Sequence, residues 1–227
     1  MRVTLYTDTL GDVSGVCRFI QDMARIALET GRDLTVVTST AKAIPETPNL
    51  VNFPPIVARR MPRYPDLDIV APPVVAMLQH AMARRADVVH TSTPGPVGLV
   101  GRMAAPLSSA PVCGVYHTDF PAYLQELYQS QFMGWATAQT MRAFYAGVRK
   151  VFSRSEEYVR ALEGIGVGRE RIDRPFRRFA EGFGRRRHVA LDRDDQRRFL
   201  RGARLAGSAR YEAQCERKDQ SGAKNSV

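Results

Sequence analysis

Two histidines stand where short apolar runs of the sequence end. The runs D-V-V-H-T-S-T-P-G-P and P-V-C-G-V-Y-H-T-D-F-P place His90 and His117 each directly before a threonine. A Val-rich run bounded by Pro, Gly and Asp is typical of a buried parallel strand. Both histidines are therefore predicted at the carboxyl edge of a sheet, where open α/β folds bind ligands. An imidazole there could hydrogen-bond a substrate hydroxyl or support charge at a reacting centre.

These residues also have structural interpretations. His117 would then cap the next helix or satisfy a buried carbonyl, and His90 would belong to the turn chemistry of the S-T-P-G-P that follows it. Asp119 is predicted as the N-cap of the helix after Pro121. Both interpretations of the two histidines stay open at the level of the sequence.

A glycine-containing turn precedes the first predicted helix. Gly11, Ser14 and Gly15 lie between an apolar run that ends near Thr7 and a segment with helical spacing. Glycines let backbone amides approach a ligand, and a helix N-terminus adds partial positive charge, so the turn suits a diphosphate. The spacing is not G-x-G-x-x-G, which excludes the dinucleotide fingerprint. The alternative is a tight turn that needs positive φ.

Several other kinds of chemistry find no support. No His/Cys cluster has metal-ligand spacing, and no G-x-S-x-G motif is present. The three cysteines are scattered, which favours a reducing cytosol. The net charge is +10, but residues 173–227 hold 15 of the 33 Lys and Arg and only 8 of the 23 Asp and Glu. The rest of the chain is nearly balanced, which argues against a nucleic-acid surface across it.

Apolar runs alternate with helical spacing through most of the chain. This alternation predicts an α/β fold with a doubly wound, parallel, Rossmann-like sheet. Residues 44–68 are Pro-rich and are predicted as loop apart from one short strand. We expect strands at 2–7, 34–38, 51–53, 87–90, 111–116 and 150–153, and helices at 16–27, 74–85, 96–105, 123–132, 136–149 and 156–164.

The character of the sequence changes after Ile172. We expect a folded domain over residues 1–172 and a basic tail over residues 173–227 that is poorly ordered or partly helical. The first apolar run is too short for a signal peptide, and no run approaches the length of a membrane span. The predicted location is cytoplasmic, with the inner face of the membrane as an alternative.

Aromatic side chains are concentrated in the two predicted helices at 123–132 and 136–149. At helical spacing such residues are usually core, so a packed interior is the first interpretation. An acceptor groove or a membrane-contacting face is the alternative. The residues concerned are Tyr123, Tyr128, Phe132, Trp135, Phe144 and Tyr145.

Four segments in order resemble the amino-terminal domain of glycosyltransferase family 4. They are L-Y-T-D-T-L-G-D-V-S-G-V, D-V-V-H-T-S-T-P-G-P-V-G, V-Y-H-T-D-F and S-R-S-E-E-Y-V-R-A-L, and the resemblance runs from Arg2 to about Ile172. It implies one half of a GT-B fold in a retaining, metal-independent, nucleotide-sugar-dependent transferase without a cofactor. It further implies that Ser14, Gly15 and Val16 face the donor diphosphate, and that His117 and Thr118 line the active site. The segment containing Ser153 and Arg154 would precede the crossing into a second domain.

The sequence departs from that family in its second half. The family's second domain carries two glutamates eight residues apart, and no Glu pair of this chain has that spacing. The Arg, Gly and Ala bias of the tail resembles out-of-frame reading of a GC-rich gene. Our hypothesis is a truncated or frameshifted transferase that is inactive alone. The alternatives are a non-catalytic subunit of a split transferase, completed by a second-domain polypeptide, and a basic-tailed protein that binds anionic lipid or nucleic acid. The sequence does not identify the sugar or the acceptor.

Overall fold

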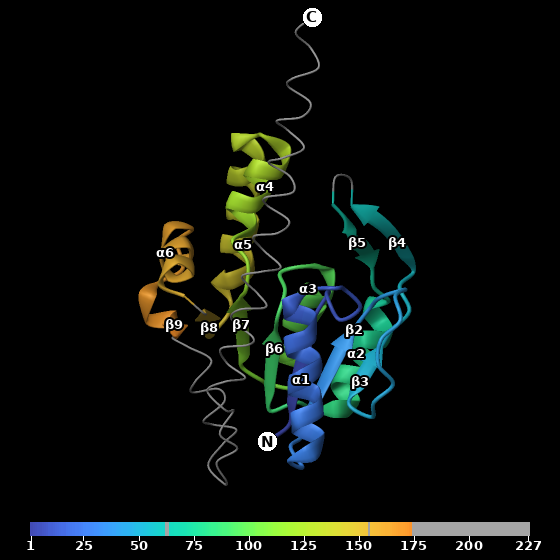
Figure 1. Ribbon diagram of the computed structural model, residues 1–227. Coiled ribbons are helices and arrows are strands. Elements are labelled where there is room, and N and C mark those ends of the chain that lie inside the picture. Colours follow the sequence, from blue (N-terminus) through green and yellow to red (C-terminus); the bar gives the residue numbers. More distant parts are fainter. Residues whose placement is uncertain (62–63, 154, 174–227) are drawn as a thin grey trace, which may run out of the picture. The chain divides into compact units, whose positions relative to one another are not determined.

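The computed structural model describes residues 1–61, 64–153 and 155–173, and for residues 64–67 it describes the backbone only. Seven parallel strands form one sheet in the order β3-β2-β1-β6-β7-β8-β9 (Figure 1). The order runs one way from β1 to β3 and the other way from β6 to β9, which makes the sheet doubly wound, as predicted. The strands are β1 (Val3–Tyr6), β2 (Leu34–Thr38), β3 (Leu50–Asn52), β6 (Val88–Thr91), β7 (Val112–Tyr116), β8 (Lys150–Ser153) and β9 (Ile172–Asp173).

Helices cover both faces of this sheet. On one face, α1 (Gly15–Glu29) packs its buried Ile20, Ala24 and Ala27 on alternate residues of β1 and β2. On the other face lie α2 (Val74–Arg84) and α3 (Pro96–Leu107), followed by α5 (Gln131–Ala146) and α6 (Glu156–Gly164). This unequal covering follows from right-handed crossovers, because the β1–β2 and β2–β3 connections run in the opposite direction along the sheet from the others, and of these two only β1–β2 contains a helix.

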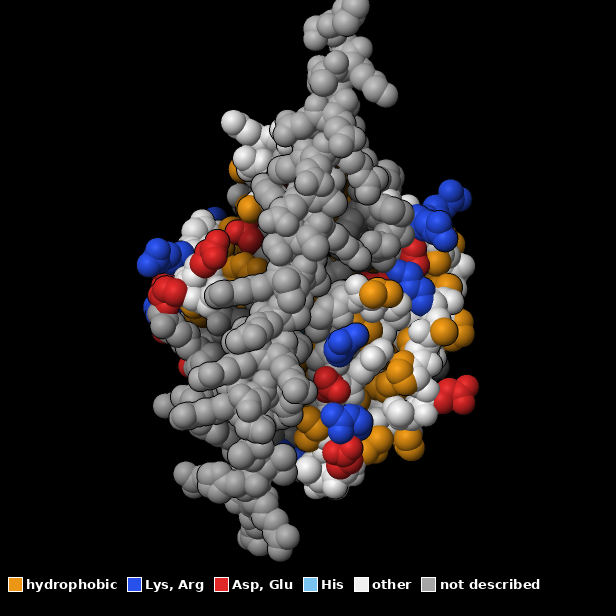
Figure 2. Space-filling model, in the orientation of Figure 1, with side chains coloured by type: hydrophobic (Ala, Val, Ile, Leu, Met, Phe, Trp, Pro, Cys, Tyr) orange, Lys and Arg blue, Asp and Glu red, His pale blue; other side chains and the backbone are white. Residues whose placement is uncertain are grey.

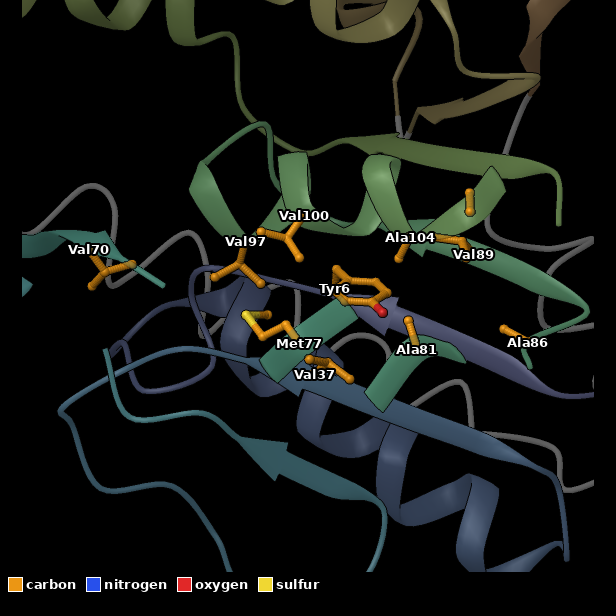
Figure 3. Close-up of a cluster of buried hydrophobic side chains, with 11 residues drawn as sticks. Tyr6, Val37, Val70, Met77, Ala81, Ala86, Val89, Val97, Val100 and Ala104 are labelled. Atoms are coloured by element: carbon orange, nitrogen blue, oxygen red, sulfur yellow. The ribbon is translucent and has the colours of Figure 1, made fainter. Parts of the chain in front are cut away.

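Tyr6 lies at the centre of the cluster beneath α2 and α3 (Figure 3). Its ring is fully buried and contacts Gly101 so closely that a Cβ there would lie 2.7 Å from the ring. The lack of a side chain at this glycine lets α3 approach the sheet. Burial raises the pKa of the Tyr6 phenol to about 12. The carboxyl end of β1 is thus held rigidly, just before the loop that reaches the candidate site.

Two stretches differ from the sequence-based expectation. The segment predicted as loop contains an antiparallel hairpin, β4 (Val57–Met61) and β5 (Tyr64–Ala71). Most of β4 is exposed, so the hairpin lacks the apolar alternation that marks a half-buried strand. The predicted helix over 123–132 is also wrong at both ends. Helix α4 (Phe120–Tyr128) ends at Gln129, whose φ of 50° is left-handed, and Ser130 then caps α5.

Helix α1 ends at a glycine with positive φ. Gly31 has a φ of 63°, and the amides of Gly31 and Arg32 donate to the carbonyls of Leu28 and Ala27, which closes the helix.

On the coloured part of Figure 2, basic and acidic side chains are interspersed, with no block of one sign. None of the helices among the described residues is long and apolar enough to span a bilayer. The predicted basic tail falls outside the described residues, apart from Asp173.

Candidate functional site

The loops after β1 and β6 meet at the carboxyl edge of the sheet, where the strand order reverses. The amide of Asp8 donates to Thr93 Oγ1 at 2.9 Å, and Thr93 Oγ1 donates to Asp8 Oδ2 at 2.6 Å. The two strands are neighbours in register, with Tyr6 beside Thr91. The loop containing the glycine turn is thereby tied to the loop that follows His90, at the place where such sheets bind ligands.

Asp8 also occupies the N-terminus of α3. Its carboxylate accepts hydrogen bonds from the amides of Val97 (2.8 Å) and Gly98 (3.3 Å), two of the first amides of that helix. A Cβ at Gly95 would lie 2.6 Å from this carboxyl group, so the glycine makes room for it. Burial raises the pKa of Asp8, although the hydrogen bonds from Thr93 and the two amides act in the opposite direction. The positive end of α3 is therefore neutralised by the chain itself.

The glycine turn brings Ser14, Gly15 and Val16 to the start of α1. Ser14 is the N-cap, and its Oγ accepts from the amide of Cys17 at 3.1 Å. Gly15 is the first helical residue, and the first turn of α1 contains no acidic residue. Unlike α3, helix α1 receives no carboxylate among the hydrogen bonds of the described residues.

Gly15 is a glycine that the described chain does not require. Its φ is outside the positive region, and a Cβ built on it would meet nothing within 4 Å. Gly11 has a different explanation, because a Cβ there would lie 2.6 Å from the Cβ of Lys42. Lys42 in turn pairs with Asp12 in the turn (2.7 Å) and with Asp68 of the β4–β5 hairpin (3.6 Å). Neither glycine supports the alternative of a turn that needs positive φ.

His117 follows β7 directly and lies beside the start of α1. Its Nε2 is 3.2 Å from Ser92 Oγ, in the loop after β6. Its ring centroid is 6.3 Å from that of Phe19, one helical turn after Gly15. Ser92 and Phe19 together orient the imidazole toward the edge that the glycine turn also occupies.

His90 lies deeper in the same face of the sheet. It is 4% exposed, pairs in register with Leu5, and stacks on Phe152 at 6.3 Å between ring centroids. Burial lowers its pKa to about 4, so the imidazole is neutral at physiological pH. Between the two histidines lies a cavity of about 10 Å³, room for about one water molecule. His90 and His117 both line this cavity.

The remaining predicted site residues have structural contacts. Asp119 caps α4 as predicted, because its Oδ1 accepts from the amide of Ala122 at 3.3 Å, and the hydroxyl of Tyr116 donates to the same atom at 3.0 Å. The carbonyl of Thr118 accepts from the amide of Phe120. Ser153 is fully buried, and its hydroxyl donates to the carbonyl of Ser155. Arg154 lies outside the described residues.

No group of three His, Cys, Asp or Glu side chains that could hold a metal ion occurs in the described part of the chain. The metal requirement of this site stays a prediction. This edge of the sheet combines one imidazole, the hydroxyl of Ser92 and the N-terminus of α1, which is capped by a serine and carries no acidic residue in its first turn. This combination suits hydrogen bonding to a polyhydroxyl compound and to an anion, side by side.

A family model for glycosyltransferase family 4 matches residues 13–174. This chain belongs to glycosyltransferase family 4. The match begins in the glycine turn, passes through His90 and His117, and ends one residue beyond β9. It therefore covers most of the described sheet and the edge that carries the candidate site.

Solved structures similar to this family member include two kinds of protein. One is HepE from Anabaena in complex with UDP-glucose, with 15% identity over 76% of this chain and 43% of that chain and a TM-score of 0.48. Another is UDP-GlcNAc 2-epimerase from Methanocaldococcus jannaschii, with 12% identity over 76% and 45% of the two chains and a TM-score of 0.45. The chain spans less than half the length of these proteins. No curated protein matches it.

Two residues of the site were not singled out from the sequence of this family member. Ser92 contacts His117 across 25 residues of sequence, and Asp8 contacts the start of α3 across about 90. Ser92 directly follows the H-T pair of the first apolar run, and Asp8 directly follows the predicted strand over residues 2–7. A polar residue within two positions of the end of a predicted parallel strand is the signal that could have found both.

Proposed function

We propose that this chain supplies the acceptor-side domain of a retaining, metal-independent glycosyltransferase. The enzyme moves a sugar from a nucleotide-sugar donor to an acceptor. The observation that carries the proposal is the family match over residues 13–174, the same residues that bring Gly15 and His117 to one edge of the sheet. The reaction uses this chain's residues to bind and orient the two substrates.

The donor diphosphate is proposed to lie at the N-terminus of α1. Two properties of the turn support this. The first turn of α1 has no acidic residue, and Asp12 in the preceding turn is paired with Lys42. Gly15 has an ordinary φ and open space around it, so nothing in the described chain demands a glycine. Close approach of a ligand to the backbone is a reason for a glycine at this position.

His117 is proposed to act near the transferred sugar. Its imidazole can hydrogen-bond a sugar hydroxyl or stabilise charge that develops at the reacting carbon. Ser92 contacts Nε2 and restricts the rotation of the ring. We propose supporting roles for Val16 and Thr118, which flank these two groups, whereas the contacts of Asp119 and Ser153 are with the chain itself.

Transfer is proposed to need a second, nucleotide-sugar-binding domain, either elsewhere in the polypeptide or as a separate subunit. Catalysis by two domains closing on a donor draws on groups from both, so one domain alone binds substrate without turnover. We propose a cytoplasmic location with peripheral contact at the inner face of the membrane. Sequencing the gene locus tests the truncation hypothesis, since a second-domain reading frame beside this one supports it.

The decisive experiment compares the purified 227-residue chain with the same chain completed by a second-domain polypeptide of the family. We expect negligible transfer from nucleotide sugars by the chain alone. In the completed enzyme, His117→Ala should lower kcat by about 100-fold or more, because general acid–base and electrostatic contributions are of that size. The midpoint of thermal unfolding should stay nearly unchanged.

His80→Ala is the matched control, because His80 lies in α2 and its ring packs on Phe53, which directly follows β3. This control should leave kcat unchanged. An equal loss of stability and activity in His117→Ala would show that His117 is structural. Defined transfer by the chain alone, abolished in His117→Ala, would show that no second domain is needed.

A further inference from the structure

The hairpin formed by α4 and α5 carries an aromatic tip with little support from the rest of the domain. No residue of α4 is buried, and the buried residues of α5 other than Gly134 begin at Met141. Gly134 lets the two helices approach closely, since a Cβ there would lie 2.9 Å from the Cβ of Gln125. The second half of α5 packs on the sheet, while α4 and the first half of α5 extend beyond it (Figure 1).

Two large aromatic side chains lie at this tip. Phe132 is 68% exposed and Trp135 is 60% exposed, and their ring centroids are 5.9 Å apart. They are the second and fifth residues of α5, directly after the turn at Gln129 and Ser130. Residues 120–141 contain one charged residue, Glu126. The first basic residue of α5 is Arg142, about 15 Å further along the helix axis from Phe132.

We propose that this tip inserts into the interface of a zwitterionic lipid bilayer. An exposed Trp–Phe pair on a nearly uncharged projection suits the headgroup level of a bilayer, where the amphipathic Trp side chain settles and the apolar Phe adds buried area. The absence of Lys and Arg from residues 120–141, together with the acidic Glu126, disfavours an anionic surface as the binding partner of the tip. The polar and charged part of α5 begins where the helix returns to the sheet, which limits insertion to the first turns.

The position of His117 links the tip to the proposed reaction. Helix α4 starts three residues after His117, and its nine residues span about 14 Å between that edge and the tip. A tip seated in the interface therefore holds the edge of the sheet just above the headgroups. The inference deepens the proposed function and rests on it in one respect: the acceptor is a lipid whose headgroup hydroxyl reaches His117.

Trp135 is the only tryptophan of the chain, so its fluorescence reports on the tip alone. The experiment mixes the full-length protein with vesicles of phosphatidylcholine. We expect a shift of Trp135 emission to shorter wavelength and quenching by brominated phosphatidylcholine, both persisting at about 0.5 M NaCl, where electrostatic attraction is screened. Phe132→Ser with Trp135→Ser should lower co-sedimentation with these vesicles about tenfold or more, since both side chains leave the interface.

Val75→Ser is the matched control, because Val75 is 71% exposed but lies on α2, outside the α4–α5 hairpin. It should bind like the wild type, and circular dichroism should show that every variant folds. Binding restricted to anionic vesicles, with unchanged Trp135 emission, would overturn the proposal in favour of the basic residues 173–227. A concentration-dependent emission shift without vesicles would overturn it in favour of a protein–protein interface. Vesicle binding needs no turnover, so its failure leaves the glycosyl-transfer proposal standing.

Discussion

Helices α1 and α3 begin at the same edge of the sheet, on its opposite faces, and their N-termini have different hydrogen-bond partners. The amides of Val97 and Gly98 at the start of α3 donate to Asp8, a carboxylate from the neighbouring loop. At the start of α1 the chain provides a serine hydroxyl and no acid. Both ends carry the same partial positive charge, so the difference indicates which of them is available to an anionic ligand. It is the end beside His117.

The two histidines repeat this contrast between a closed and an open position. His90 is buried against Phe152 in the middle of the sheet face, whereas His117 lies beyond the end of β7 beside Ser92. Both follow a Val-rich run and both precede threonine. The same local sequence therefore places one histidine within a strand and buried, and the other just beyond the end of a strand, depending on how far each strand extends.

The largest expected effect is the pH dependence that His90 contributes to stability. Its folded pKa of about 4 lies below the ordinary value of 6.5, so only the unfolded chain binds this proton between those pH values. Stability from this group is complete above pH 6.5 and is lost as the pH falls toward 4. We expect a loss of roughly 3 kcal/mol in the free energy of unfolding over this window.

Urea unfolding at several pH values measures this effect. His90→Gln should remove most of the pH-dependent loss, because glutamine does not titrate. His80→Gln leaves His90 in place and should keep most of it. If wild type and His90→Gln lose stability in parallel between pH 6.5 and 4, His90 is not a buried neutral histidine.

The second prediction tests whether Asp8 stabilises the N-terminus of α3. Asp8→Ala leaves the amides of Val97 and Gly98 and the hydroxyl of Thr93 without their acceptor. We expect a loss of about 2 kcal/mol or more in the free energy of unfolding, since buried donors without a partner are costly. Asp22→Ala, at an exposed position of α1, is the control and should stay within about 0.5 kcal/mol of wild type. A similar value for both variants would mean that Asp8 does not close α3.

The strands and several helix ends could be predicted because their causes are local. A buried parallel strand is apolar on both faces, so β2 and β8 were predicted at their observed residues. Helix α6 also matches, because Ser155 as N-cap and a glycine near its end are local signals. The β4–β5 hairpin was missed because most of β4 is exposed and has no buried face to set a pattern.

The candidate site could be predicted only in part, for the opposite reason. His117 and Gly15 were found because each lies at the boundary of a predicted element. Their partners depend on contacts between loops far apart in the sequence, such as Asp8 with Thr93 and Ser92 with His117. The distinction between the closed and the open helix N-terminus therefore required the structure.

The weakest effect to detect, and the most direct test of the central claim, is anion binding at the open end of α1. The measurement is a titration of the isotope-labelled full-length chain with inorganic diphosphate, followed by amide nuclear magnetic resonance. We expect saturable shifts for the amides of Gly15 and Val16, unmoved amides at Val97 and Gly98, and loss of the shifts in Gly15→Val. Gly164→Val is the matched control, because Gly164 also has open space around it. Shifts at Gly98 equal to those at Gly15, or none at Gly15, would contradict the account.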